Sequence, residues 1–205
     1  MASSTAPSSA TTPTWPRATG AARIFTCSAL VVALPVGSTY ASVEERTGTQ
    51  PIAGYLLQAR VEASAGLELE PNDTAAAATA LPGSDIFVTG NHAMNTDADF
   101  YAITVPAGRS LRAEILEGDA ETCESTDVDS FLTLFDASGL ALGGDDDAGR
   151  GFCSLIDGTG ALPADDYAHD LAAGTCYLLV EAAPGAQAPG DTAGQFVYRL
   201  ALTLR

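Results

Sequence analysis

The stretch Phe196-Val197-Tyr198-Arg199-Leu200-Ala201-Leu202-Thr203-Leu204 alternates regularly along its nine residues. Aromatic and aliphatic side chains occupy one set of alternate positions, and Arg199 and Thr203 lie in the other set. Side chains point to opposite faces of a β-strand with a period of two, so this pattern predicts a strand with one buried face.

Seven further short apolar runs are separated by turn-forming residues. They are 86–88, 100–105, 111–116, 131–135, 140–142, 154–156 and 176–180. The turn Pro106-Ala107-Gly108 predicts that the two runs beside it form a hairpin. No run has the pattern of a long amphipathic helix, and residues 74–80 would form one or two helical turns at most. About eight short strands predict an all-β fold, a β-sandwich or jelly roll.

The charge of the chain excludes several classes of partner. Among its 205 residues there are 26 acidic and nine basic ones, and the net charge is −17. All nine basic residues are arginine. Such a negative surface repels nucleic acid and anionic membranes, whereas cations and cationic partners are compatible with it.

The first 41 residues resemble an export signal. An apolar core at Ile24–Val36 follows a Ser/Thr/Ala-rich leader, and Thr39-Tyr40-Ala41 places small residues where a signal peptidase cleaves. The core is too short to span a bilayer and contains Pro35, so we expect no membrane span in the mature protein. We predict a signal peptide at 1–41, a spacer at 42–67, a domain at 68–205, and secretion to the periplasm, the cell surface or the medium.

Three cysteines remain after the predicted cleavage. Cys123 and Cys153 lie in polar, turn-like surroundings, whereas Cys176 lies in an apolar run. An oxidising compartment allows one disulfide among three cysteines. We predict a Cys123–Cys153 disulfide and a buried Cys176 thiol.

The segment Glu68-Leu69-Glu70-Pro71-Asn72-Asp73-Thr74 begins the predicted domain. In an extended backbone, alternate residues place Glu68, Glu70 and Asn72 on one side. Converging oxygens of this kind suit calcium, which takes six to eight oxygen ligands in flexible geometry. The alternative is a solvated acidic turn, and these residues alone leave both interpretations open.

A second acidic run, Asp145-Asp146-Asp147, has the same two interpretations. It would form a second calcium loop, with Asp127 and Asp129 contributing, or an acidic surface turn, which we prefer. Catalytic motifs are absent: there is no Gly-x-Ser-x-Gly or His-Glu-x-x-His sequence. Cys176 and His169 are poorly spaced in a β-rich region to act as nucleophile and base, so we expect no enzymatic activity.

The order of motifs over residues 68–205 resembles the bacterial pre-peptidase C-terminal domain family, which is related to clostridial collagenase collagen-binding domains. The motifs are Glu-x-Glu-Pro-Asn-Asp-Thr, Asp-x-Asp-Phe-Tyr-x-Ile-x-Val-Pro-Ala-Gly, Asp-x-Phe-Leu-x-Leu-Phe-Asp-x-x-Gly, Asp-Asp-Asp, Leu-x-Ala-Gly-Thr-x-Tyr-Leu-Leu-Val and a final Tyr-x-Leu strand. The resemblance implies a jelly-roll β-sandwich of about eight strands.

The resemblance also implies a calcium site where the lead-in segment meets the sheet. The family's ligands fall on positions that match in residue type: Glu68, Glu70, Asn72, Asp73 and Asp99. Asp97 is a near neighbour that could replace one of them. Collagen-binding members carry tyrosines late in the strand after the Ala-Gly turn, where this chain has Glu181 and Ala183, so collagen binding is not implied.

The family's domains usually accompany secreted peptidases, where they assist secretion, maturation or substrate attachment. Our first hypothesis is therefore a secreted, calcium-binding, non-catalytic module that binds a protein or polysaccharide, or that serves a peptidase in trans. The second is a structural cell-envelope protein stabilised by calcium. A small hydrolase has no supporting motif. Surface aromatic residues on one sheet face would favour the binding role.

Overall fold

The computed structural model describes residues 61–94, 96–117, 128–184 and 194–205. The predicted signal peptide, most of the predicted spacer, and residues Cys123 and Asp127 lie outside these ranges. Within them, the chain is all-β.

Ten strands and one short 3-10 helix make up the domain. They are β1 (Ala63–Leu67), β2 (Thr79–Leu81), β3 (Ile86–His92), β4 (Asp99–Val105), β5 (Leu111–Glu117), β6 (Ser130–Phe135), β7 (Ala141–Asp145), β8 (Leu155–Asp157), η1 (Asp166–Ala168), β9 (Gly174–Ala182) and β10 (Phe196–Leu204).

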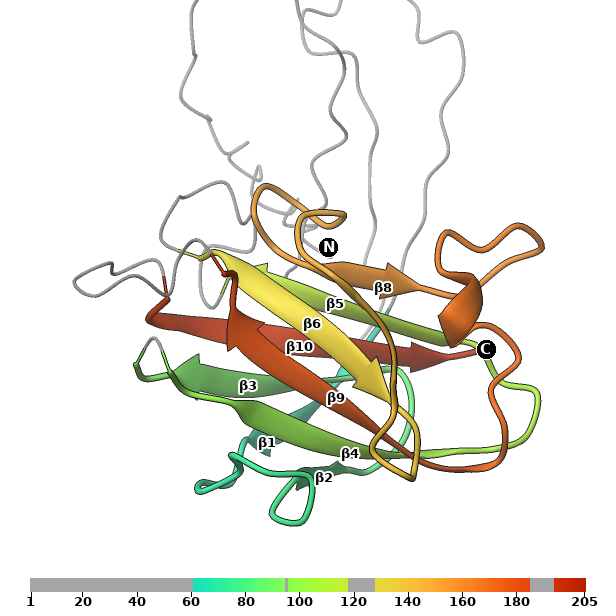
Figure 1. Ribbon diagram of the computed structural model, residues 1–205, viewed down its shortest axis with the longest axis horizontal. Helices are drawn as coiled ribbons and strands as arrows, with labels where there is room; N and C mark the ends of the chain where they lie inside the picture. Colours follow the sequence, from blue (N-terminus) through green and yellow to red (C-terminus); the bar gives the residue numbers. More distant parts are fainter. Residues whose placement is uncertain (1–60, 95, 118–127, 185–193) are drawn as a thin grey trace, which may run out of the picture.

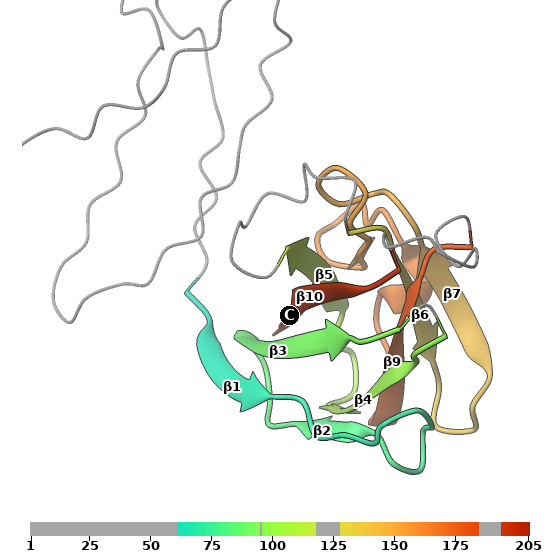
Figure 2. The ribbon, with the colours of Figure 1, turned by 90° about the vertical axis from the view of Figure 1, so that its left-hand side faces the viewer.

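The strands form two five-stranded sheets that stack face to face (Figures 1 and 2). Sheet A has the order β1-β3-β10-β5-β8, and sheet B has the order β2-β4-β9-β6-β7. Consecutive strands lie in different sheets throughout, except for the β6–β7 hairpin. This alternation confirms the predicted sandwich of jelly-roll type.

All eight strands predicted from the sequence are present, as β3 to β10. The other two, β1 and β2, lie at the edges of the two sheets. β1 lies at the end of the segment expected to be a spacer. Its residues Ala63 and Ser64 pair in parallel with Ile86 and Phe87 of β3, so this part of the segment belongs to sheet A. The region predicted to contain one or two helical turns forms a turn followed by β2.

The predicted hairpin between β4 and β5 is wrong. β4 pairs with β2 and β9, whereas β5 pairs with β10 and β8 of the other sheet. The Pro106–Ser110 segment therefore crosses between the sheets. Its far end is held by Ser110, whose backbone pairs with that of Arg205 at the end of β10.

The core lies between the inner faces of the two sheets. Alternate residues of the central strands are fully buried there, as the period-two pattern predicts. The largest include Tyr101, Ile103, Leu132, Leu134, Leu178, Tyr198, Leu200 and Leu202. In the described part of the chain, no helix has the length and apolar character to cross a membrane.

Candidate metal centre

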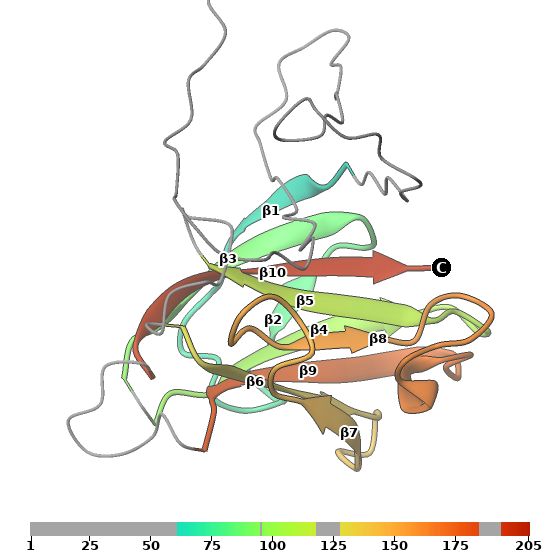
Figure 3. The same ribbon diagram turned by 90° about the horizontal axis from the view of Figure 1, so that it is seen from above.

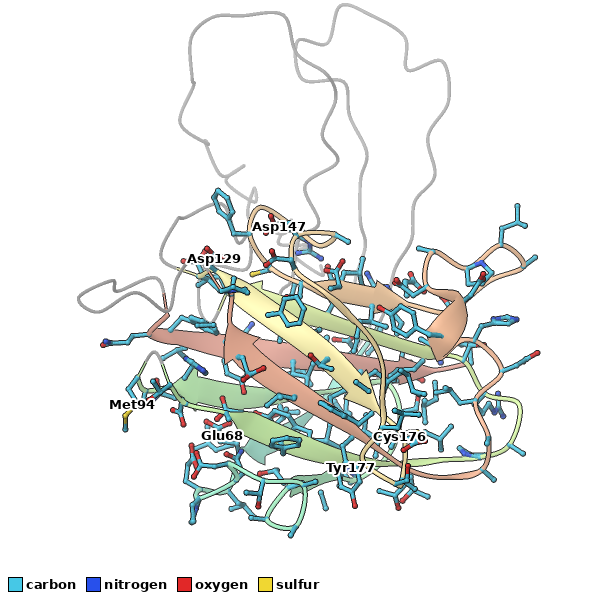
Figure 4. All side chains as sticks on the ribbon, viewed as in Figure 1. Glu68, Met94, Asp129, Asp147, Cys176 and Tyr177 are labelled. Carbon is cyan, nitrogen blue, oxygen red and sulfur yellow. The ribbon has the colours of Figure 1, made fainter. Side chains whose placement is uncertain are left out.

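Three carboxylates converge where the lead-in segment meets β4. Glu68 and Glu70 follow β1, and Asp99 is the first residue of β4. One oxygen atom from each of the three lies within 4.8 Å of the others. Figure 4 shows Glu68 on the same side of the molecule as Met94, beside β3 and β4. The structure thus brings together the two parts of the chain that the sequence assigned to one site.

Hydrogen bonds from backbone N–H groups hold the lead-in segment together and against the sheet. The Asn72 N–H donates to Oε2 of Glu70 at 3.0 Å, and the Asn72 carbonyl accepts from the Phe100 N–H at 3.0 Å. The Leu69 N–H donates to Oγ1 of Thr79 in β2 at 3.0 Å. The peptide bond between Glu70 and Pro71 is cis. Asn72 therefore lies between the Glu70 carboxylate and the start of β4.

Two buried tyrosines link the carboxylates to the core. The Tyr198 hydroxyl donates to Oδ2 of Asp99 at 2.6 Å, and the Tyr101 hydroxyl donates to Oε2 of Glu68 at 2.6 Å. The two hydroxyl oxygens are 2.7 Å apart. Glu68 also accepts the Asn91 N–H of β3 at 2.5 Å through Oε1. These hydrogen bonds hold both carboxylates in place from within the sandwich.

Tyr198 fits because its neighbour in β3 is a glycine. Tyr198 of β10 pairs with Gly90 of β3, and a Cβ atom on Gly90 would overlap the tyrosine ring. The sequence analysis missed both tyrosines as site residues. The available signal was the hydroxyl of Tyr101, which lies two residues after Asp99 and hence on the same side of β4.

Two acceptor atoms at this place have no hydrogen-bond donor. Asn72 and Asp99 are both fully buried, and Oδ1 of each has no partner. A buried polar atom without a partner costs free energy, about 1–3 kcal/mol. Oδ1 of Asn72 is an acceptor only, and so is Oδ1 of Asp99 when the carboxyl is ionised, so a cation would satisfy both atoms.

The raised pKa of Asp99 also favours a bound cation at this place. Burial raises the pKa of its carboxyl from 3.8 to about 8, and the Glu68 carboxylate adds to the rise, whereas the hydroxyl of Tyr198 lowers the pKa. Burial, followed by the charge of Glu68, also raises the pKa of Glu70, against the hydrogen bond from Asn72. Without a cation, Asp99 keeps its proton at neutral pH.

Asp73 and Asp97, the other acidic residues of this region, lie around the carboxylate group. Asp73 is exposed and is not one of the three converging carboxylates. Asp97 accepts the N–H groups of Ala93 and Ala98 through its carboxylate. The buried His92 ring places Nε2 2.8 Å from the Asp97 carbonyl oxygen, which fixes the loop before Asp99.

A second group of carboxylates forms at the start of β6. Asp129, Asp146 and Asp147 have oxygens within 4.8 Å of one another, and Oδ1 of Asp146 is buried without a partner. Figure 4 labels Asp129 and Asp147 there. Asp145 is not in the group, because its Oδ1 accepts the Ala148 and Leu155 N–H groups. A second site and an acidic turn both remain compatible with this geometry.

The cysteines agree with the sequence analysis where the structure describes them. Cys176 is a buried free thiol. Burial raises the pKa of this thiol, and the charge of Asp136 raises it further. Cys153 is fully buried, but Cys123 lies outside the described residues. The Cys123–Cys153 disulfide therefore stays a prediction.

Ser110, His169 and Asp170 form a group that resembles a catalytic triad in composition only. Nδ1 of His169 lies 3.0 Å from Oγ of Ser110 and 2.7 Å from the carbonyl oxygen of Gly158. A carbonyl is only an acceptor, so Nδ1 carries the hydrogen and cannot take one from the serine. The group joins the Gly158 turn to the start of β5.

Comparison with known proteins gives partial matches. A stretch of 111 residues is 37% identical to a protein of Deinococcus radiodurans described as a probable subtilase-type serine protease. The stretch is 54% of this chain but only 14% of the protease. No protein-family model matches the chain.

Two solved structures resemble the fold. One is the pre-peptidase C-terminal domain of a collagenase from Bacillus anthracis, with 12% identity and a TM-score of 0.36. The other is PliG of Aeromonas hydrophila, a periplasmic inhibitor of g-type lysozyme, with 14% identity and a TM-score of 0.39. Each match covers 72% of this chain and all of the other.

Proposed function

We propose that this chain is an exported, calcium-binding, non-catalytic β-sandwich module of the pre-peptidase C-terminal type, which serves a secreted peptidase as an accessory or binding domain. The motifs along residues 68–205 and the 37% identity to part of a subtilase-type protease support the assignment. Because the matched stretch is a small part of that protease, the peptidase itself would be supplied by another chain or by a larger polypeptide.

One observation carries the calcium part of the proposal. Oδ1 of Asn72 and Oδ1 of Asp99 are buried acceptors without donors, in the region where Glu68 and Glu70 add two carboxylates. All the potential ligand atoms are oxygens, some charged and some neutral. Calcium prefers this kind of ligand set, whereas softer metals do not. Asp73 is exposed and lies outside the converging group, so its role as a ligand rests on the sequence alone and stays a prediction.

The bound ion would act on stability. It would join the lead-in segment, through Glu68, Glu70 and Asn72, to Asp99 at the start of β4. It would also remove the repulsion among the three carboxylates, and the buried Asp99 would no longer need a proton. Calcium at 100 times its dissociation constant would add about 2.7 kcal/mol to the free energy of unfolding.

The alternative is a structural cell-envelope protein that calcium stabilises without any further partner. It predicts the same metal site, so calcium binding does not separate the two. The outer surface of sheet B separates the two hypotheses, because the aromatic residues on it favour the binding role. No arrangement in the described part of the chain supports hydrolase chemistry.

Thermal unfolding in calcium and in chelator tests the metal site. We expect calcium to raise the melting temperature of the wild-type protein, and the double variant Glu70→Ala/Asp99→Ala to lose this rise. The matched control, Asp146→Ala/Asp147→Ala, removes the same number of carboxyl groups from the second acidic group and should keep the rise. A wild-type melting curve that is the same in calcium and in chelator would contradict the proposal.

A further inference from the structure

The outer face of sheet B carries aromatic side chains in neighbouring positions. Tyr177 of the central strand β9 pairs with Ala102 of β4 on one side and with Phe135 of β6 on the other. Phe100 of β4 pairs with Leu179, two residues further along β9. Their neighbours in sequence, such as Tyr101, Leu134 and Leu178, are fully buried in the core. We call the outward-facing set Phe100, Phe131, Phe135, Tyr177 and Leu179 the aromatic face.

Two rings of the aromatic face pack against each other on the solvent side of the sheet. The centroids of Phe100 and Phe135 are 6.0 Å apart, with the ring planes tilted by 38°. Phe131 lies over Gly144 of β7, where a Cβ atom would be 3.1 Å from its ring. The four rings are half-buried, and Leu179 between them is 8% exposed. The result is an apolar surface shared by three strands.

No other element of the described chain covers this face. Sheet B faces the viewer in Figure 1, and Figure 3 shows β6, β7 and β9 at the side of the sandwich away from sheet A. Figure 4 shows Tyr177 on this open side. An antiparallel sheet face that meets only water normally carries polar side chains, so four aromatic residues on it indicate a contact surface.

The charged side chains on the strands of sheet B are all acidic. The strands of sheet B contain neither arginine nor lysine, and Glu181 of β9 faces outwards beside Phe131. Among the arginines that the structure describes, Arg112 and Arg199 are on strands of sheet A, Arg150 and Arg205 pair with Glu114 and Asp85, and Arg109 lies in the segment that crosses between the sheets. The whole chain has a net charge of −17. A partner for this face has to be neutral or positive.

We infer that the aromatic face binds an extended, basic polypeptide segment. Arginine and lysine side chains bind over aromatic rings and are attracted by a surface of negative charge, so both features of the face favour the same occupant. Glu181 would pair with one of these cations. This inference names a ligand class for the binding role in the proposed function and rests on that role, but it does not depend on the calcium site.

Fluorescence anisotropy with labelled nona-arginine and nona-lysine peptides tests the inference in about 0.15 M salt, which screens distant charges. We expect both peptides to bind the wild-type protein, while nona-glutamate does not. The variant Phe135→Leu/Tyr177→Leu keeps apolar bulk but removes two rings, and it should weaken binding about tenfold. The matched control is Phe87→Leu on sheet A, where the ring contacts Arg199; it should not change binding.

A charge variant keeps the test valid if the ring variants unfold. Glu181→Gln should weaken binding at least threefold, whereas Asp170→Asn, which removes one charge near the opposite end of β9, should leave it unchanged. Equal effects of the two variants would overturn the inference, because binding would then depend only on net charge. Binding of cellohexaose or maltoheptaose at the rings, without binding of the peptides, would also overturn it and assign a neutral polysaccharide. Self-association of the wild-type protein that is lost in the ring variant would overturn the inference too, because a second copy of the chain would then be the occupant.

Melting temperatures of the same variants separate this inference from the calcium proposal. The ring variants should retain the rise in melting temperature that calcium produces in the wild type. Peptide binding without any calcium effect would contradict the metal site alone, and a calcium effect without peptide binding would contradict the aromatic face alone.

Discussion

Replacing Tyr198 with phenylalanine removes one hydroxyl from the centre of the site and leaves the ring in place. This hydroxyl donates to Oδ2 of Asp99 at 2.6 Å and lies 2.7 Å from that of Tyr101. A hydrogen bond to a charged group contributes about 1.5–3 kcal/mol. For a domain of this size, about 3 °C of melting temperature corresponds to each kcal/mol. We therefore expect Tyr198→Phe to lower the melting temperature in calcium by roughly 5–9 °C.

Differential scanning calorimetry in saturating calcium measures this effect. The control is Tyr177→Phe, which removes a tyrosine hydroxyl from the outer face of sheet B and should change stability by no more than about 0.5 kcal/mol. Tyr198→Phe should also bind calcium more weakly, since the ionised form of Asp99 loses a hydrogen-bond donor. If Tyr198→Phe has the melting temperature of the wild type both in calcium and in chelator, the buried network does not support the carboxylates and the reasoning fails.

Three further predictions concern neighbouring groups. Gly90→Ala should destabilise the protein by about 1–3 kcal/mol, because the added Cβ displaces the Tyr198 ring; urea unfolding with an unchanged midpoint would contradict this. The raised pKa of Asp99, about 8, means that the calcium-free folded protein binds this proton more tightly than the unfolded chain. The stability that this proton contributes is therefore full below the unfolded pKa of 3.8 and is lost progressively as the pH rises to about 8. Calcium should consequently raise the melting temperature more at pH 8 than at pH 5, and equal rises in scanning fluorimetry would oppose this. The buried Cys176 thiol, whose pKa burial raises, should react with a thiol reagent only after unfolding; fast labelling of the native protein would disprove its burial.

The sequence predicted the fold well wherever a strand has a strong period-two pattern. β10 and β4 are examples, because each alternates large apolar residues with smaller or polar ones and each crosses the core. β1 was missed because Ala63–Leu67 consists of four small residues and one exposed leucine, so no hydrophobic pattern marks it. The connection after β4 was misassigned because a Pro-Ala-Gly turn is compatible with a hairpin and with a crossing between sheets.

The candidate site shows a similar division. The chemistry of the lead-in segment predicted that Glu68 and Glu70 converge, and the family resemblance implied that Asp99 joins them; the structure brings these three together. The tyrosine network was not predictable in the same way, since Tyr101 and Tyr198 are on strands of different sheets and meet only through the packing of the sandwich. Local sequence carries the ligand chemistry, whereas the support beneath it depends on register and on the glycine opposite Tyr198.

A crystal structure of the protein grown in calcium, with the ion located by its anomalous signal, tests the central claim most directly. We predict one ion with oxygens of Glu68, Glu70, Asn72 and Asp99 at about 2.3–2.6 Å, so that Oδ1 of Asn72 and Oδ1 of Asp99 both gain a partner. A map with no ion there, and with these two oxygens bonded to water or to protein donors instead, would contradict the account.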